Sequence, residues 1–162
     1  MKKLSKLEAI LWNIALPGFS QLLAGRYLKG ITLILLEFAI NVNSHFNIAI
    51  MYSFLWEIDM ATKVIDFQWL MFYPCVYMFG MWDAYRDAMP KDEKLTFLPF
   101  VFGAYFVTIG LMYSTSLTIF GIKFGPVFLP MLFLLPGLII GLVIKYLIII
   151  ITTKRTREKM YE

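Results

Sequence analysis

Four long apolar stretches run through this chain of 162 residues, at 31–52, 69–88, 95–120 and 127–151. Each approaches or exceeds the roughly 20 residues that a helix needs to cross about 30 Å of hydrocarbon. With 60% hydrophobic and only 16% charged residues, the chain has too little polar surface to cover a water-soluble globule of its size. The sequence therefore predicts an all-α integral membrane protein with four transmembrane helices, at 30–52, 67–88, 95–120 and 127–151.

The first 29 residues differ from these stretches, because an apolar run at 7–16 ends at Pro17-Gly18. Proline lacks a backbone N–H and glycine tolerates positive φ, so this pair favours a turn. As a helix, residues 9–16 rise only about 12 Å, less than half of the hydrocarbon thickness. We therefore expect a re-entrant or interfacial helical hairpin at 1–29, in which Gly25 and Gly30 let backbones approach closely.

A fifth span and a cleaved signal peptide are the alternatives for this N-terminal segment. The positive-inside rule counts the Lys and Arg residues outside the spans. The hairpin leaves Lys63 and Lys123 outside and puts twelve basic residues in the cytoplasm, whereas five spans give nine inside and five outside. The twelve are Lys2, Lys3, Lys6, Arg26, Lys29, Arg86, Lys91, Lys94, Lys154, Arg155, Arg157 and Lys159. Cleavage after Ala24 would leave the later basic ends external. We favour the hairpin with both termini cytoplasmic, and the five-span topology stays open.

A single membrane domain is expected over 1–162, because no loop is long enough for a separate soluble domain. The net charge of +4 comes from basic residues at the ends of spans and in the tail at 152–162, so we predict no nucleic-acid binding. Cys75 is the only cysteine, which excludes an intrachain disulfide. The loop at 53–66 has helical periodicity and is expected to lie at the outer interface. The basic ends of the spans predict a cell membrane as the location.

Polar side chains in the first span carry the most demanding chemistry. Glu37, Asn41, Ser44 and His45 fall on one helical face, and such a stripe should face protein or water. Intramembrane ionisable residues are by default functional candidates. Three interpretations stand side by side: hydrogen bonding between helices, a proton or solute path, and catalysis. Lys145 in the fourth span has the depth of Glu37, which predicts an ion pair between them.

Signatures of catalysis and of metal binding are mostly missing from the sequence. One histidine cannot form an HExxH-type zinc site, and no GxSxG elbow or phosphate-binding glycine loop is present. We expect no metal and no cofactor. The end of the second span carries Asp83, Tyr85, Arg86 and Asp87, which we interpret as a solvated helix end. Separately, the small-xxx-small pair at 137 and 141 is weak evidence for a dimer.

Two segments of the chain carry a family resemblance. Residues 16–30 read LPGFSQLLAGRYLKG and residues 82–88 read WDAYRDA. Here the chain resembles a loosely defined group of small uncharacterised bacterial membrane proteins, with a PGFGQ-like segment before an apolar helix and a later DAY-type end. It is also distantly similar to the two-transmembrane-helix domain family, although Gly25-Arg26-Tyr27 stands where that family has an acidic-basic-aromatic turn. The resemblance implies a compact helical membrane module without an assigned activity, located in a bacterial cytoplasmic membrane.

The expected function is non-enzymatic. We predict an accessory or assembly protein that lies in the lipid bilayer and acts by interaction with a membrane-protein partner or a second copy of itself. The alternative is a small transporter or channel subunit that uses the polar stripe of the first span. A stripe that faces a water-filled cavity would favour transport, whereas a stripe that packs dry against helices would favour the interaction role.

Overall fold

The structure is a computed structural model, and it describes residues 4–90 and 93–158. Helices dominate it, which confirms the all-α class. They are α1 (Lys6–Ala15), α2 (Phe19–Leu23), α3 (Tyr27–Ser44), α4 (Phe46–Phe54), α5 (Ile58–Val64), α6 (Phe67–Leu70), α7 (Tyr73–Ala88), α8 (Leu98–Tyr113) and α9 (Gly125–Glu158). Two short antiparallel strands, β1 (Thr118–Ile119) and β2 (Ile122–Lys123), join α8 to α9.

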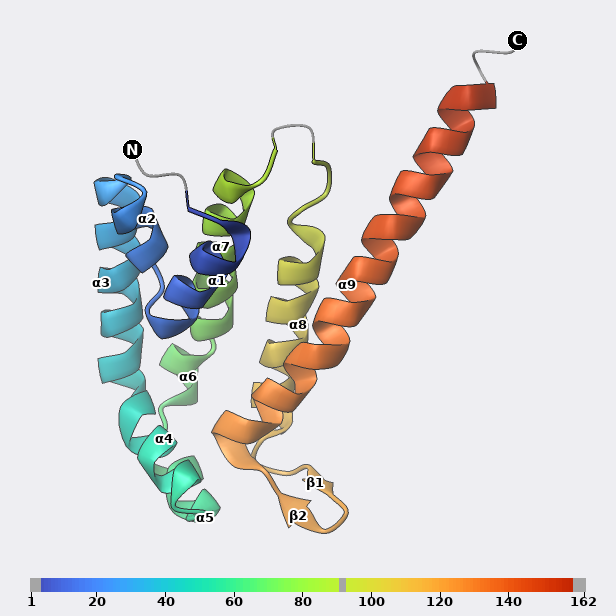
Figure 1. The fold of residues 1–162 in the computed structure, drawn as a ribbon. Helices are drawn as coiled ribbons and strands as arrows, with labels where there is room; N and C mark the ends of the chain where they lie inside the picture. Colours follow the sequence, from blue (N-terminus) through green and yellow to red (C-terminus); the bar gives the residue numbers. More distant parts are fainter. Residues whose placement is uncertain (1–3, 91–92, 159–162) are drawn as a thin grey trace.

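The chain passes four times along the long axis of the molecule (Figure 1). α3 and α4 run from the upper to the lower end, α7 returns, α8 runs down and α9 returns again. The N-terminal hairpin, the end of α7 and the end of α9 therefore lie at one end, which we call the terminal end. α5 and the two strands lie at the opposite end, which we call the distal end.

The four passes are less regular than the sequence predicts. In the described part of the chain, α9 over Gly125–Lys154 is the single helix that is long and apolar enough to cross a membrane alone. α3 and α4 meet that standard only as a pair, and a bend of 68° separates them. The prediction of one continuous helix at 30–52 is therefore wrong. The predicted helix at 67–88 is divided into α6 and α7, where Pro74 stands in the first turn of α7, the position that proline favours.

The predicted helix at 95–120 ends early, at Tyr113, and the chain then forms the β-hairpin. Ile119 pairs with Ile122, so Phe120 and Gly121 are the two residues of the turn. Their φ angles are 51° and 77°. Positive φ at both central residues matches the twist of a two-residue hairpin.

Small residues allow α8 and α9 to pack closely. A Cβ on Gly137 would lie 2.7 Å from the carbonyl oxygen of Phe102, and a Cβ on Gly141 would lie 2.6 Å from the Cα of Pro99. On α8, a Cβ on Gly110 would lie 2.7 Å from the Cα of Pro130. The small-xxx-small pair therefore serves a contact inside the chain, which corrects its interpretation as evidence for a dimer.

The distal end has its own apolar core. Ala49, Ala61, Ile65, Leu70 and Leu111 are buried together there. The predicted helix in the segment 53–66 is present as α5, and Ile58, Ala61 and Ile65 on its expected apolar face are buried, whereas Phe54 is exposed. Lys123 of β2 reaches across to Asp59 of α5 at 2.8 Å. α5 thus closes the lower end of the helices rather than extending away from them.

Candidate functional site

Three of the four residues of the predicted polar stripe, Asn41, Ser44 and His45, lie at the bend between α3 and α4. His45 forms the break with φ at 56°, a left-handed conformation that a residue other than glycine seldom adopts. Asn41 spans the break, because its Oδ1 accepts from the backbone N–H of Asn47 at 3.3 Å and its Nδ2 donates to Oδ1 of Asn47 at 3.1 Å. Ser44 is fully buried, and its carbonyl accepts from the backbone N–H of Asp66. These side chains hold the bend together.

The predicted pair between Glu37 and Lys145 is corrected by the structure. The ammonium of Lys145 lies 2.8 Å from Oε1 of Glu93, in the segment before α8. Glu37 instead lies within electrostatic range of Tyr73 and Tyr77 on α7. The physical reason is that the two helices have different neighbours: α9 packs along α8, whereas α3 packs against α2, α6 and α7. Equal depth in a membrane does not make two helices neighbours.

The N-terminal hairpin turns at Pro17-Gly18. Gly18 has φ at 98°, and a Cβ there would lie 2.5 Å from the carbonyl oxygen of Gly30. Asn13 is fully buried in the preceding helix, where its Oδ1 accepts from the backbone N–H of Gly18 at 2.8 Å and its Nδ2 donates to the carbonyl of Ala9. Gly25, at φ 78°, gives the second change of direction before α3. The turn is therefore supported from within by a buried amide.

A buried carboxylate joins this hairpin to the end of α7. Asp83 is 1% exposed, and its Oδ1 accepts from Lys29 Nζ at 2.7 Å and from Arg86 Nη2 at 3.2 Å. Its Oδ2 accepts from Gln21 Nε2 at 3.3 Å. A buried carboxylate needs such partners, because an unpaired charge away from water is costly. The predicted interpretation of this helix end as simply solvated is therefore incomplete.

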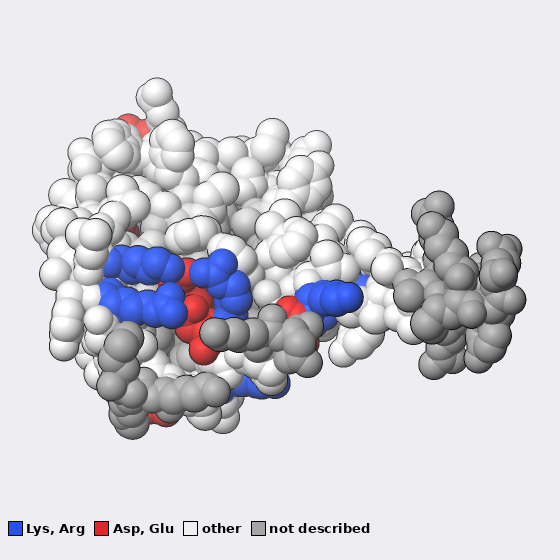
Figure 2. Space-filling model, turned by 90° about the horizontal axis from the view of Figure 1, so that it is seen from above, with Lys and Arg blue, Asp and Glu red and all other residues white. Residues whose placement is uncertain are grey.

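A second ion pair closes the same contact. Arg26 Nη1 lies 2.5 Å from Oδ2 of Asp87, with the two side chains 36% and 20% exposed. Arg86 also stacks over the Trp82 ring, 4.6 Å from its centroid. Tyr85 takes no part in these ion pairs and packs against Phe100 of α8. We call Arg26, Lys29, Asp83, Arg86 and Asp87 the terminal charge cluster, and Figure 2 shows blue and red side chains gathered on this face.

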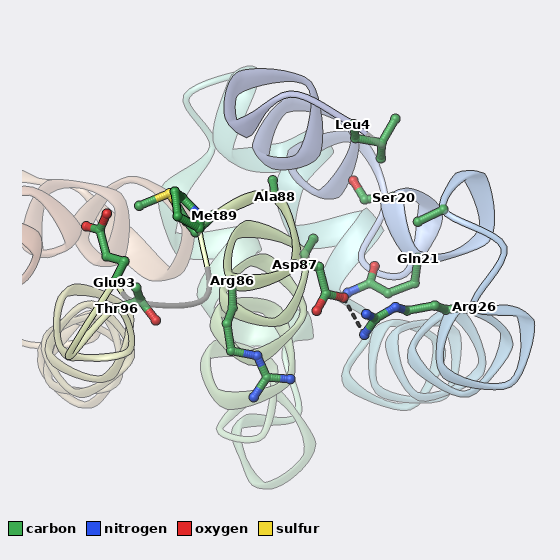
Figure 3. Close-up of a pocket in the computed structure, with 13 residues that line it drawn as sticks. Leu4, Ser20, Gln21, Arg26, Arg86, Asp87, Ala88, Met89, Glu93 and Thr96 are labelled. Atoms are coloured by element: carbon green, nitrogen blue, oxygen red, sulfur yellow. Dashed lines mark ion pairs between the residues drawn. The ribbon is translucent and has the colours of Figure 1, made fainter. Parts of the chain in front are cut away.

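A pocket of about 740 Å³ opens beside this cluster at the terminal end. Figure 3 shows Gln21, Arg26 and Asp87 converging on one side of it, while Glu93 and Thr96 contribute from the segment before α8. Gln21 is 1% exposed; its Nε2 donates to the carbonyl of Gly80 at 2.9 Å, but its Oε1 has no hydrogen-bond partner among the described residues. A buried acceptor without a partner calls for an explanation, because its desolvation is uncompensated.

The described lining of the pocket is polar and of mixed charge. Within the described residues, no group of three or more His, Cys, Asp or Glu side chains is arranged to hold a metal ion. Among the described residues, the charged groups that line the pocket are Arg26, Arg86, Asp87 and Glu93, two of each sign. Such a lining offers hydrogen bonds and charge pairing to a polar partner of low net charge.

Comparison with known proteins gives no relative from which a role could be transferred: no protein-family model, no curated protein and no solved structure matches the chain. The resemblance drawn from the two sequence segments therefore stays a prediction. The structure does bring those two segments together, through the contacts of Arg26 with Asp87 and of Lys29 with Asp83.

The sequence analysis assigned no role in this site to five residues that the structure places in or beside it: Asn13, Gln21, Lys29, Glu93 and Thr96. One signal could have found Lys29. Bases at the start of one helix and acids at the end of the next lie at the same end of an antiparallel pair, so Lys29 and Asp83 are predicted neighbours once α3 and α7 are placed together. Asn13 offered no comparable signal.

Proposed function

We propose that this chain is a multi-pass protein of a bacterial cytoplasmic membrane that crosses the bilayer four times. The terminal end is cytoplasmic, and the hairpin of α1 and α2 enters from that side without crossing. Four passes, with the beginning of α1 and the end of α9 both towards the terminal end, support this arrangement. The large apolar side chains exposed along the helices support it too, among them Leu35 and Phe38 on α3, Val101 and Tyr105 on α8, and Ile139 and Ile150 on α9.

Helix lengths agree with this arrangement. α1 has 10 residues and rises about 15 Å, half of a hydrocarbon core. α3 has 18 residues and α8 has 16, or about 27 Å and 24 Å. A bilayer accommodates helices of this length by local thinning, at a modest cost.

We further propose that the protein acts by binding, without catalysis, and that a membrane-protein partner engages the pocket beside the terminal charge cluster. The observation that carries this proposal is the Oε1 atom of Gln21, which is buried in the wall of that pocket and has no hydrogen-bond donor among residues 4–90 and 93–158. A partner that brings an N–H or O–H group into the pocket would satisfy it. The balanced charges of the lining favour a polar, near-neutral segment.

Transport receives less support. The stripe residues Glu37, Asn41, Ser44 and His45 line neither this pocket nor the second cavity between α3 and α7. Asn41 and Ser44 are occupied by hydrogen bonds at the bend. No observation on this stripe therefore favours a solute path over a structural role.

The topology is tested by single cysteines in a Cys75→Ser background, labelled with a membrane-impermeant thiol reagent in intact cells. Lys63→Cys on the exposed face of α5 should label, whereas Lys6→Cys and Lys154→Cys should label only after the membrane is opened. Labelling of Lys6→Cys together with protection of Lys154→Cys would replace this arrangement by five spans.

The binding role is tested by a photo-crosslinking amino acid at Ala88, which lines the pocket, with Thr62 on α5 as the matched position at the distal end. A discrete protein adduct should form at position 88 and not at position 62. Gln21→Met removes the unpaired acceptor and should reduce the amount of that adduct per molecule of protein recovered. An adduct that is equal at both positions, or insensitive to Gln21→Met, would contradict the proposal.

A further inference from the structure

A second cavity of about 670 Å³ lies between α3 and α7. Its walls are apolar, with Leu33 and Leu36 on α3 and Val76 and Phe79 on α7. Lys29 and Asp83 stand at its terminal end. The cavity is an open groove, since Leu36 is 45% and Phe79 is 51% exposed. It thus combines an apolar channel along two helices with ionic groups at one mouth.

The groove follows the direction that a lipid chain takes in a membrane. From Lys29 to Leu36 the helix advances seven residues, or about 10 Å. Cys75 lies on α7 two turns below Asp83. Cys75 on one wall and Leu36 on the other therefore line the lower part of the groove. A chain that entered at the charged mouth would therefore run towards the middle of the bilayer.

The charges at the mouth are complementary to an anionic headgroup. The terminal charge cluster has three cations, Arg26, Lys29 and Arg86, against the two carboxylates of Asp83 and Asp87. The side chains of Lys29 and Arg86 are each 46% exposed. An ammonium has three N–H donors and a guanidinium five, so each of these two can hold Asp83 and bind a further acceptor.

We propose that the groove holds one acyl chain of an anionic phospholipid, whose phosphate is bound by Lys29 and Arg86. The inference rests on the proposed membrane location, because it takes the terminal end to lie at headgroup level. The cluster excess of one positive charge matches the single negative charge of a phosphodiester. A zwitterionic headgroup adds a cation beside Arg26 and Arg86 and is therefore bound less well.

The test is native mass spectrometry of the full chain in a delipidating detergent, with phosphatidylglycerol or phosphatidylcholine added at equal concentration. One phosphatidylglycerol molecule should bind with the higher affinity. Lys29→Gln should weaken that binding about fivefold, the effect of one basic residue on an anionic lipid surface. Lys63→Gln, at the distal end, should leave it unchanged.

The groove itself is tested by Val76→Trp, which fills the channel, against Val101→Trp on the exposed face of α8. Val76→Trp should abolish the bound lipid and Val101→Trp should retain it. A measurement on the unmodified chain keeps the test independent of variant folding: Cys75 is the sole thiol, and phosphatidylglycerol should slow its reaction with N-ethylmaleimide more than phosphatidylcholine does.

Equal binding of the two lipids, lipid binding that survives Val76→Trp, or Cys75 labelling that neither lipid slows would overturn the inference. Its failure is separable from that of the proposed function. If the lipid tests fail while Lys63→Cys is labelled and Lys6→Cys is protected, only the lipid site is refuted and the topology stands. If lipid binds in detergent while Lys63→Cys is protected and Lys6→Cys is labelled, the topology is refuted and the lipid groove stands.

Discussion

The ammonium of Lys145 on α9 lies 2.8 Å from the carboxylate of Glu93, in the segment that leads into α8. The Lys145 side chain is 9% exposed and that of Glu93 is 33% exposed, so the two partners are unequally hydrated. The pair fastens the loop between α7 and α8 to the last helix at the terminal end.

Glu93→Gln should destabilise the protein more than Lys145→Met. Glu93→Gln leaves a buried ammonium without its counter-charge, at a cost of about 1–3 kcal/mol. Lys145→Met leaves a carboxylate that water can reach, and its cost should be smaller. Thermal unfolding in detergent measures both, and a double-mutant cycle should give a coupling near zero between Lys145 and Glu37. Coupling of Lys145 to Glu37 instead of Glu93 would restore the pair that equal depth predicts.

Gly18→Ala should be much more damaging than Gly121→Ala. Both glycines have left-handed φ angles, 98° and 77°, so both substitutions carry a backbone cost of about 1–2 kcal/mol. A Cβ on Gly121 meets nothing within 4 Å, whereas one on Gly18 would lie 2.5 Å from the Gly30 carbonyl. The difference in melting temperature between the two variants therefore isolates the clash. Equal losses would show that the hairpin turn yields easily.

Asn13→Ala should lower the free energy of unfolding by about 1–3 kcal/mol, because the backbone N–H of Gly18 loses its acceptor in a buried place. Asn43→Ala is the matched control, since Asn43 is exposed and donates only to the Ala39 carbonyl one turn back on α3. Denaturation of the two variants under identical detergent conditions compares them. An Asn13→Ala loss no larger than that of the control would contradict the support assigned to this amide.

The hydrogen bond and the charge of Lys123 hold the pKa of Asp59 below its usual value. Lys123→Met should therefore raise the pKa of Asp59 towards 3.8, and Lys63→Met should raise it less, since Lys63 contributes the weakest attraction. A carboxyl NMR titration measures both. The pKa of Asp59 is lower in the folded than in the unfolded protein. The ion pair with Lys123 therefore stabilises the fold at pH values above the unfolded-state pKa, and this stabilisation is lost as the pH falls through the folded-state pKa. Exposure and salt keep it small, so thermal stability near neutral pH should not change.

Local signals in the sequence predict part of this fold. Pro17-Gly18 predicts a turn because both residues act on their own backbone, and a turn is found there. The bend at His45 has no such signal. It depends on Asn41, which bridges to Asn47, and on Asp66, whose backbone N–H binds the Ser44 carbonyl from a segment far along the chain. A helix break that needs a distant partner is invisible to periodicity.

The site follows the same division. Hydropathy and charge place Lys29 and Asp83 at one end of the molecule, but their pairing requires that α3 pack beside α7. Depth in the membrane alone suggests Glu37 as the partner of Lys145. Glu93 is the partner in the structure because α9 packs beside α8 and not beside α3. Gln21 is held in the wall of the pocket by its hydrogen bond to the Gly80 carbonyl. This backbone acceptor cannot be predicted from the types of side chain in the sequence.

α9 continues without interruption from Gly125 to Glu158, 34 residues or about 51 Å. Gly137 and Gly141 pack against α8 near Phe102 and Pro99, and the C-terminal part of the helix leans away from the other helices (Figure 1). Because α8 holds α9 along only part of its length, a small tilt of α9 at this contact moves the Glu158 end of the helix further than it moves the contact itself.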